Sequence, residues 1–251
     1  MIEPSSGQQT PPESEPMRVE PVRVSVRMPA STPVVTYVIM GVTVAMFLLQ
    51  QVSDLPVLLG IKVNSLIIQG QYWRLITPVL LHGDWAHIGF NMYALFSFGP
   101  NLEKAYGHSR FLLLYLIGAL AGNVASFMLT SNPSLGASTA IFGLVAAEAM
   151  YFIQNRKFFA GRLRAVLGNI GLVIAFNLVY GFATTTIDNW GHLGGLIGGA
   201  IFAYLAGPVF ELEGFVPDLR MVDKRPPLLP WLVALVEAAA LALIASNKIF
   251  R

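Results

Sequence analysis

The sequence lacks cysteine altogether, which excludes disulfides and thiolate chemistry from its 251 residues. It is also poor in charge: 12% of the residues are charged and 55% are hydrophobic, and this excludes an ordinary soluble globular protein. A net charge of only +2 gives no support for a nucleic-acid partner. No cofactor is implied. The first apolar run begins near Pro33 without a small-residue cleavage site behind it, so we expect this run to remain as a membrane anchor.

What the sequence does contain is a series of apolar runs of about 17–25 residues, the length of helices that cross a bilayer. Residues 1–32, rich in Pro, Ser, Glu and Gln, predict a disordered tail instead. The pattern predicts an all-α polytopic membrane protein with a six-helix core over 33–210, a linker over 211–227 and a seventh helix with a short tail over 228–251. The seven predicted spans are 34–52, 86–106, 109–130, 136–154, 165–183, 190–210 and 228–247.

The positions of Lys and Arg predict how the chain crosses the membrane. With the N-terminus in the cytoplasm, twelve of the 16 basic residues fall on the inner side, as the positive-inside rule requires. The linker is then cytoplasmic and the C-terminus lies outside. No organelle transit signal stands out, which suggests a bacterial plasma membrane. Residues 53–85 mix Trp, Tyr, Lys and Arg with apolar residues and are expected to lie in the outer interface.

Polar residues occur at the outer ends of three predicted helices. His87 and Asn91 share one helix face, Ser138 opens the fourth helix, and His192 opens the sixth. Each lies within the first turns of its helix, so the four side chains have a similar depth in the membrane. Polar groups are costly in lipid, and their convergence indicates a functional site.

The sixth helix also repeats glycine every four residues, at Gly191, Gly195 and Gly199. Small residues at this spacing allow two helices in lipid to approach closely, which would place Ser138 beside His192. A neutral imidazole can take the proton of a serine hydroxyl during nucleophilic attack. His87, Asn91 and the first backbone N–H groups of the fourth helix could stabilise an oxyanion. No third carboxylate is obvious, although Asp188 could either cap the sixth helix or orient His192.

Other polar residues have competing interpretations. His82 and His87 are five residues apart, which does not match the four-residue spacing of a helical zinc motif, so we assign no metal site. His82 either contacts water and headgroups or supports the site. Glu103 is expected to accept hydrogen bonds from a loop or a helix end. Glu148 and Glu237 have no assigned role.

Taken together, the motifs resemble the rhomboid intramembrane proteases from about Trp73 to Pro208. The matching residues are Trp73-Arg74, His82 with His87 and Asn91, Gly99-Pro100-Asn101-Leu102-Glu103, Gly136-Ala137-Ser138 with Phe142-Gly143, and His192-Leu193-Gly194-Gly195 with Gly199. The resemblance implies a six-helix rhomboid-like bundle, here with one additional C-terminal transmembrane helix.

The same resemblance implies roles for individual residues. Ser138 and His192 would form the catalytic dyad, while His87 and Asn91 would line the oxyanion site. Phe142 would stack on the catalytic ring, and Trp73-Arg74 would fix the first loop in the outer leaflet.

The implied activity is cleavage of membrane-protein substrates in or near their transmembrane segments, with the active site towards the outer side. The family usually has glycine after the nucleophile, whereas this chain has the bulkier Thr139. That departure supports an alternative, a catalytically inactive relative that binds client transmembrane helices. A transporter is a third alternative, but it predicts paired internal repeats, which the sequence does not show.

Overall fold

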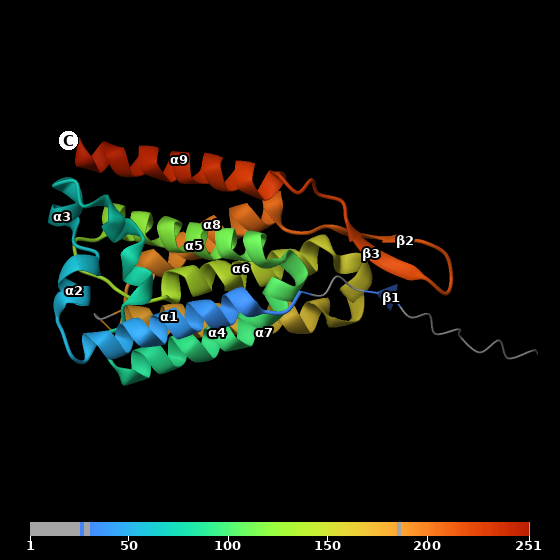
Figure 1. Ribbon diagram of the computed structural model, residues 1–251, viewed down its shortest axis with the longest axis horizontal. Coiled ribbons are helices and arrows are strands. Elements are labelled where there is room, and N and C mark those ends of the chain that lie inside the picture. The colour runs from blue at the N-terminus through green and yellow to red at the C-terminus, as the bar shows by residue number, and fades with distance from the viewer. Residues whose placement is uncertain (1–25, 28–30, 185–186, 251) are drawn as a thin grey trace, which may run out of the picture.

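The structure is a computed structural model that describes residues 26–27, 31–184 and 187–250 (Figure 1). Its long helices run side by side, and each predicted apolar run coincides with one of them. These helices are α1 (Val34–Gln50), α4 (Trp85–Tyr106), α5 (His108–Leu129), α6 (Ser138–Gln154), α7 (Arg156–Ala183), α8 (Asn189–Ala206) and α9 (Leu229–Ile249).

The helix α7 begins well before the predicted start at Ala165. A short helical segment from Arg156 continues into the apolar run across a kink at Phe159, where φ is −124° and ψ is 16°. The prediction missed this first segment because it was based on apolar runs, and the basic residues of the segment interrupt the apolar pattern.

Three helices in the described part of the chain, α5, α7 and α9, are long and apolar enough to cross a bilayer by length and composition. The helices α1 and α6 are apolar but shorter, at 17 residues each. The chain is thus an integral membrane protein with a helical bundle, and the number of seven crossings stays a prediction.

The predicted interfacial stretch between α1 and α4 folds into short helices at one end of the bundle (Figure 1). They are α2 (Leu55–Gly60), α3 (Asn64–Ile68), η1 (Tyr72–Leu75) and η2 (Thr77–Leu80). The buried Arg74 guanidinium donates to the carbonyls of Leu58 and Ile61, at 2.7 Å each. The Trp73 indole N–H donates to the Leu59 carbonyl at 3.0 Å. These two residues therefore tie η1 to the end of α2.

A small sheet projects from the opposite end of the bundle (Figure 1). In it β3 (Leu219–Asp223) pairs antiparallel with β2 (Phe210–Glu213) and parallel with β1 (Val26–Arg27). The sequence predicted only a linker and a disordered tail here. Short strands that alternate charged and apolar residues give no strong signal by themselves, and residues 1–25 and 28–30 of the tail lie outside the described residues.

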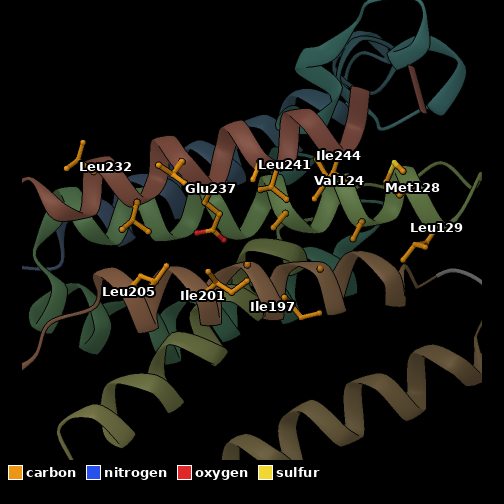
Figure 2. Close-up of a pocket in the computed structure, with 17 residues that line it drawn as sticks. Val124, Met128, Leu129, Ile197, Ile201, Leu205, Leu232, Glu237, Leu241 and Ile244 are labelled. Carbon is orange, nitrogen blue, oxygen red and sulfur yellow. The ribbon is translucent and has the colours of Figure 1, made fainter. Parts of the chain in front are cut away.

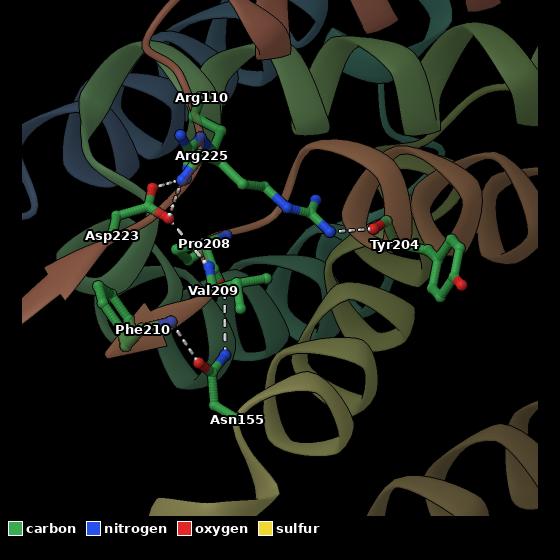
Figure 3. A network of polar contacts seen from close by, with 8 residues as sticks. All are labelled: Arg110, Asn155, Tyr204, Pro208, Val209, Phe210, Asp223 and Arg225. Atoms are coloured by element: carbon green, nitrogen blue, oxygen red, sulfur yellow. Dashed lines mark hydrogen bonds and ion pairs between the residues drawn. The ribbon is translucent and has the colours of Figure 1, made fainter. Parts of the chain in front are cut away.

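Polar contacts fix this sheet to the helices (Figure 3). The Asn155 side chain donates to the Pro208 carbonyl at 3.0 Å and accepts from the Phe210 N–H at 2.8 Å. Arg110 of α5 pairs with Asp223 of β3 at 2.7 Å. The sheet is thus anchored to the ends of α5 and α6 instead of hanging from a loose linker.

The centre of the bundle is formed by α5, α6 and α8, which approach each other at glycines. A Cβ atom added to Gly199 of α8 would overlap the backbone of Gly143 of α6, and one on Gly195 would overlap the carbonyl of Thr139. On its other side, α8 meets α5 so closely that a Cβ atom on Gly194 would overlap the side chain of Ala125. The glycine repeat therefore brings α8 into backbone contact with α6, as its spacing predicted, and Gly194 adds a close contact with α5.

Glu103 connects α4 to the start of α1. Its buried carboxylate accepts from the N–H groups of Val35 and Thr36, at 2.8 and 2.7 Å, and from the Thr36 hydroxyl at 2.6 Å. It thus stabilises unpaired donors at the first turn of a helix, the role expected from the sequence.

Candidate active site

Ser138 and His192 meet where α6 and α8 begin. The Ser138 Oγ atom lies 2.9 Å from Nε2 of His192, within hydrogen-bond distance. The histidine ring is buried, whereas Ser138 is half-buried. This contact joins residues that are 54 positions apart in the chain, and it depends on the close glycine packing of the two helices.

Phe142, one turn along α6 from Ser138, fixes the plane of the His192 ring. The two rings stack with centroids 4.3 Å apart and planes 12° from parallel. The Nδ1 atom of His192 is buried and has no hydrogen-bond partner among the described residues. The His192 ring is therefore positioned by stacking, and no carboxylate in the described part of the chain accepts a hydrogen bond from its Nδ1 atom.

The loop before Ser138 brings His87 to the same place. Gly136 has a φ of +131°, which only glycine adopts readily. A Cβ atom there would also lie 2.8 Å from Cε1 and Nε2 of His87, so any side chain at this position would displace the ring. Gly136 thus allows the His87 imidazole to lie beside the start of α6.

Asn91 lies one turn further along α4 and is buried. Its side-chain amide donates to the His87 carbonyl at 2.9 Å, within its own helix. The structure therefore places Asn91 on the His87 side of the site, with its amide engaged by the backbone.

His82, for which the sequence left two interpretations open, is buried beneath the Ser138 loop. Its Nε2 atom accepts from the Ala137 N–H at 3.4 Å, and its backbone exchanges two hydrogen bonds with the Gln50 side chain. Burial, and to a lesser extent His87, lowers the pKa of His82 to about 3, against a smaller opposing effect of Asp84. A neutral His82 thus supports the loop that leads into Ser138.

Thr139 faces away from the dyad, into the space between α5 and α8. Its neighbours are glycines: a Cβ atom on Gly191 would lie 3.1 Å from the Thr139 methyl group, and one on Gly122 would clash with its Cβ. The bulk of the β-branched residue is accommodated by these two glycines. It does not separate Ser138 from His192.

Asp188 is the N-cap of α8, with one carboxylate oxygen accepting from the Gly191 N–H at 2.9 Å. Its other oxygen accepts a short hydrogen bond from the Ser126 hydroxyl, which also accepts from the Lys62 ammonium at 2.9 Å. The sequence suggested the cap but missed Lys62 and Ser126. In the sequence, only the free-energy cost of burying a lysine and an aspartate near a membrane interface could have indicated that the two charges lie close together.

A groove lies elsewhere, between α5, α8 and α9 (Figure 2). It has a volume of about 690 Å³ and an apolar lining apart from Glu237, and neither dyad residue contributes to it. The described residues also hold no group of three His, Asp or Glu side chains that could bind a metal ion.

Comparison with known proteins identifies the class to which this fold and site belong. The model of the rhomboid domain matches residues 69–209, more than half of the chain. The chain belongs to the rhomboid family. The match includes Ser138, His192, His87 and Asn91, as well as the loop that holds Trp73 and Arg74.

Individual relatives agree with this assignment. The chain is 44% identical to rhomboid protease GluP of Bacillus subtilis over 181 residues, which is 70% of this chain and 35% of that protein. It is 34% identical to RHOMBOID-like protein 9, chloroplastic, of Arabidopsis thaliana, over 63% of this chain and 37% of that protein. The chain is 30% identical to Rhomboid-like protease 1 of Toxoplasma gondii, over 77% of this chain and 63% of that protein. The chain thus matches only about a third of the length of the first two relatives.

Proposed function

We propose that the protein is an intramembrane serine protease that hydrolyses peptide bonds in or near transmembrane segments of other membrane proteins. The observation that carries the proposal is the 2.9 Å contact between Ser138 Oγ and His192 Nε2. The names of GluP and of the Toxoplasma relative describe them as proteases, which supports the same reaction class for this chain.

In the first step, Ser138 Oγ attacks the carbonyl carbon of the scissile bond while its proton passes to His192 Nε2. The C–N bond then breaks, and His192 returns that proton to the leaving amine nitrogen, which leaves an ester on Ser138. Water hydrolyses the ester by the reverse transfers and restores both side chains. His192 must be neutral with its proton on Nδ1, and Phe142 keeps the ring aligned throughout.

The oxyanion formed by attack would be stabilised at the start of α6. The first N–H groups of a helix have no intrahelical acceptor and carry partial positive charge, and Ser138 is the first residue of this helix. The His87 ring lies beside Gly136 at the same helix start. The Asn91 amide, which now donates to the His87 carbonyl, would join them by rotation towards the substrate.

Cleavage of a purified single-span substrate in liposomes, together with labelling by a fluorophosphonate probe, tests the proposal. Ser138→Ala is expected to reduce both to background, and His192→Ala to reduce both at least about a hundredfold. Ser97→Ala, on the exposed face of α4, is the matched control and should retain full activity. Equal cleavage by wild type and Ser138→Ala would sink the assignment of Ser138 as nucleophile. A wild type that neither cleaves the substrate nor reacts with the probe would instead favour the inactive helix-binding alternative.

We also propose that the N-terminus is cytoplasmic, in a bacterial plasma membrane, with the active site towards the outer side. The absence of native cysteine makes this directly testable. A cysteine placed at Asn132, before α6, should react with an impermeant maleimide in intact cells. One placed at Phe215, in the exposed β2–β3 turn, should react only after permeabilisation. The reverse pattern would overturn the orientation.

A further inference from the structure

Lys62 is a fully buried basic residue in the first loop, between α2 and α3. Its ammonium donates to the Ser126 hydroxyl at 2.9 Å and to the Asn132 carbonyl at 2.8 Å. Burial lowers the pKa of Lys62 to about 8, while the charge of Asp188 acts to raise it. At neutral pH the side chain is therefore charged, and a buried charge is tolerated only where partners compensate it.

The charge of Lys62 is connected to the first turn of α8. Ser126 of α5 accepts from Lys62 and donates its own proton to the Asp188 carboxylate. Asp188 in turn accepts from the Gly191 N–H through its side chain, at 2.9 Å, and from the His192 N–H through its carbonyl, at 3.0 Å. Two side-chain hydrogen bonds thus link Lys62 to the residue that precedes the His192 turn.

The backbone of Lys62 is connected to the other half of the dyad. Its N–H donates to the Ser134 carbonyl at 3.0 Å, and the Ser134 N–H donates back to the Lys62 carbonyl at 3.2 Å. Ser134 lies four residues before Ser138, in the segment that leads into α6. One loop residue thus contacts the segments that precede both helices of the site.

We propose that Lys62 is a positioning residue of the dyad, which holds the starts of α6 and α8 at the separation that Ser138 and His192 need. Its ammonium does so through the Asn132 carbonyl, in the segment that leads to Ser134 and α6, and through the Ser126–Asp188 pair at the start of α8. The proposal rests on the proposed protease function, and it gives Asp188 a second role beyond capping.

The expected consequence is a loss of turnover more than of substrate binding. Proton transfer from Ser138 to His192 requires their 2.9 Å contact, and a misplacement of about 1 Å can cost on the order of a hundredfold in rate. Lys62 is not part of the dyad, and the proposed mechanism gives it no contact with the substrate. Its removal should therefore lower kcat and the rate of probe labelling while KM changes little.

Lys248 offers a matched control. This lysine of α9 also binds the outer end of α5, donating to the carbonyls of Phe127 and Met128 at 2.6 and 3.3 Å. It lies close enough to influence the charge of Lys62. Within the described part of the chain, however, Lys248 makes no hydrogen bond to Ser126, Ser134 or Asp188. If losing any positive charge at this end of α5 lowered activity, both lysine variants would lose kcat. If the loss comes from dyad positioning, only the Lys62 variant will lose kcat.

The experiment compares wild type, Lys62→Met, Ser126→Ala and Lys248→Met, each as the full chain in liposomes. We expect kcat and the fluorophosphonate labelling rate to fall about tenfold or more for the first two variants, with KM within about twofold. Lys248→Met should retain the wild-type kcat. Ser126→Ala, a smaller change than loss of the lysine, keeps the test valid if Lys62→Met folds poorly.

Hydrogen exchange of the same proteins gives a readout that does not require activity. Amides of residues 134–140 and 188–194 should exchange faster in Lys62→Met, whereas Lys248→Met should leave both segments unchanged. Wild-type kcat in both Lys62→Met and Ser126→Ala, or an equal loss of kcat in Lys248→Met, would overturn the positioning role. An inactive wild type with the expected exchange pattern would instead overturn the protease function and leave the coupling intact.

Discussion

The helices α5 and α7 are both apolar enough to cross a bilayer, yet 61% of the apolar window of α5 is buried within the protein and only 11% of that of α7. The difference lies in what their glycines face. A Cβ atom on Gly122 of α5 would overlap Thr139 of α6 and Gly191 of α8, whereas one on Gly168 or Gly171 of α7 would meet nothing within 4 Å. Hydropathy therefore marks a helix for lipid, but matched small residues decide which helices pack together.

The contact between Ser138 and His192, the candidate dyad, depends on the tightly packed helices α5, α6 and α8. Ser138 and His192 lie on α6 and α8, both of which contact α5, while Phe176 and other large side chains of α7 remain exposed on the bundle surface. A polar contact across two helices requires fixed backbones, because a hydrogen bond weakens within a few tenths of an ångström. The loosely packed helix is free of that constraint.

The largest effect is expected from a side chain inserted between α6 and α8. Gly199→Val would force the α8 backbone away from Gly143 and should reduce probe labelling of Ser138 by about a hundredfold or more. Gly171→Val makes the same chemical change on α7 and should leave labelling and thermal stability near wild type. Similar losses in both variants would show that the contrast between the two helices is wrong.

A smaller effect is expected from acid, through the buried His82, which supports the loop that leads into Ser138. In the unfolded chain His82 has its ordinary pKa of 6.5, whereas burial in the folded protein lowers this pKa to about 3. The unfolded state therefore binds more protons between these values, so His82 makes the protein lose stability as pH falls from about 6.5 to 3. Thermal unfolding at pH 7.5 and 4.5 should show a smaller acid-induced loss for His82→Gln than for wild type. An unchanged loss would exclude His82 as its source.

The smallest effect is expected at Thr139. Thr139→Gly removes a side chain that fills space between Gly122 and Gly191, so a loss of stability of about 1–2 kcal/mol should follow from the cavity and the added backbone freedom. Because the threonine does not separate the dyad, labelling of Ser138 should not increase. Faster labelling by Thr139→Gly would show that the side chain does hold the two residues apart.

Sequence-based prediction succeeded for features that are local in the chain and failed for contacts between segments distant in sequence. Each apolar run marked a helix because hydropathy is a local property, and the glycines of α8 indicated its close contacts. The strands β1 and β3 were missed, since their pairing joins Val26 to Leu219 across most of the chain. The link from Lys62 through Ser126 to Asp188 was missed for the same reason, because its members lie on three segments distant in sequence.

The sequence by itself determined the membrane class, the positions of the long helices, the rhomboid resemblance and the identity of the candidate dyad. Only the tertiary structure decided that Ser138 reaches His192, that Thr139 fits between glycines, and that a buried lysine joins the segments before both helices. The physical reason is that composition and spacing act along the chain, whereas distances between side chains depend on how helix backbones pack across it.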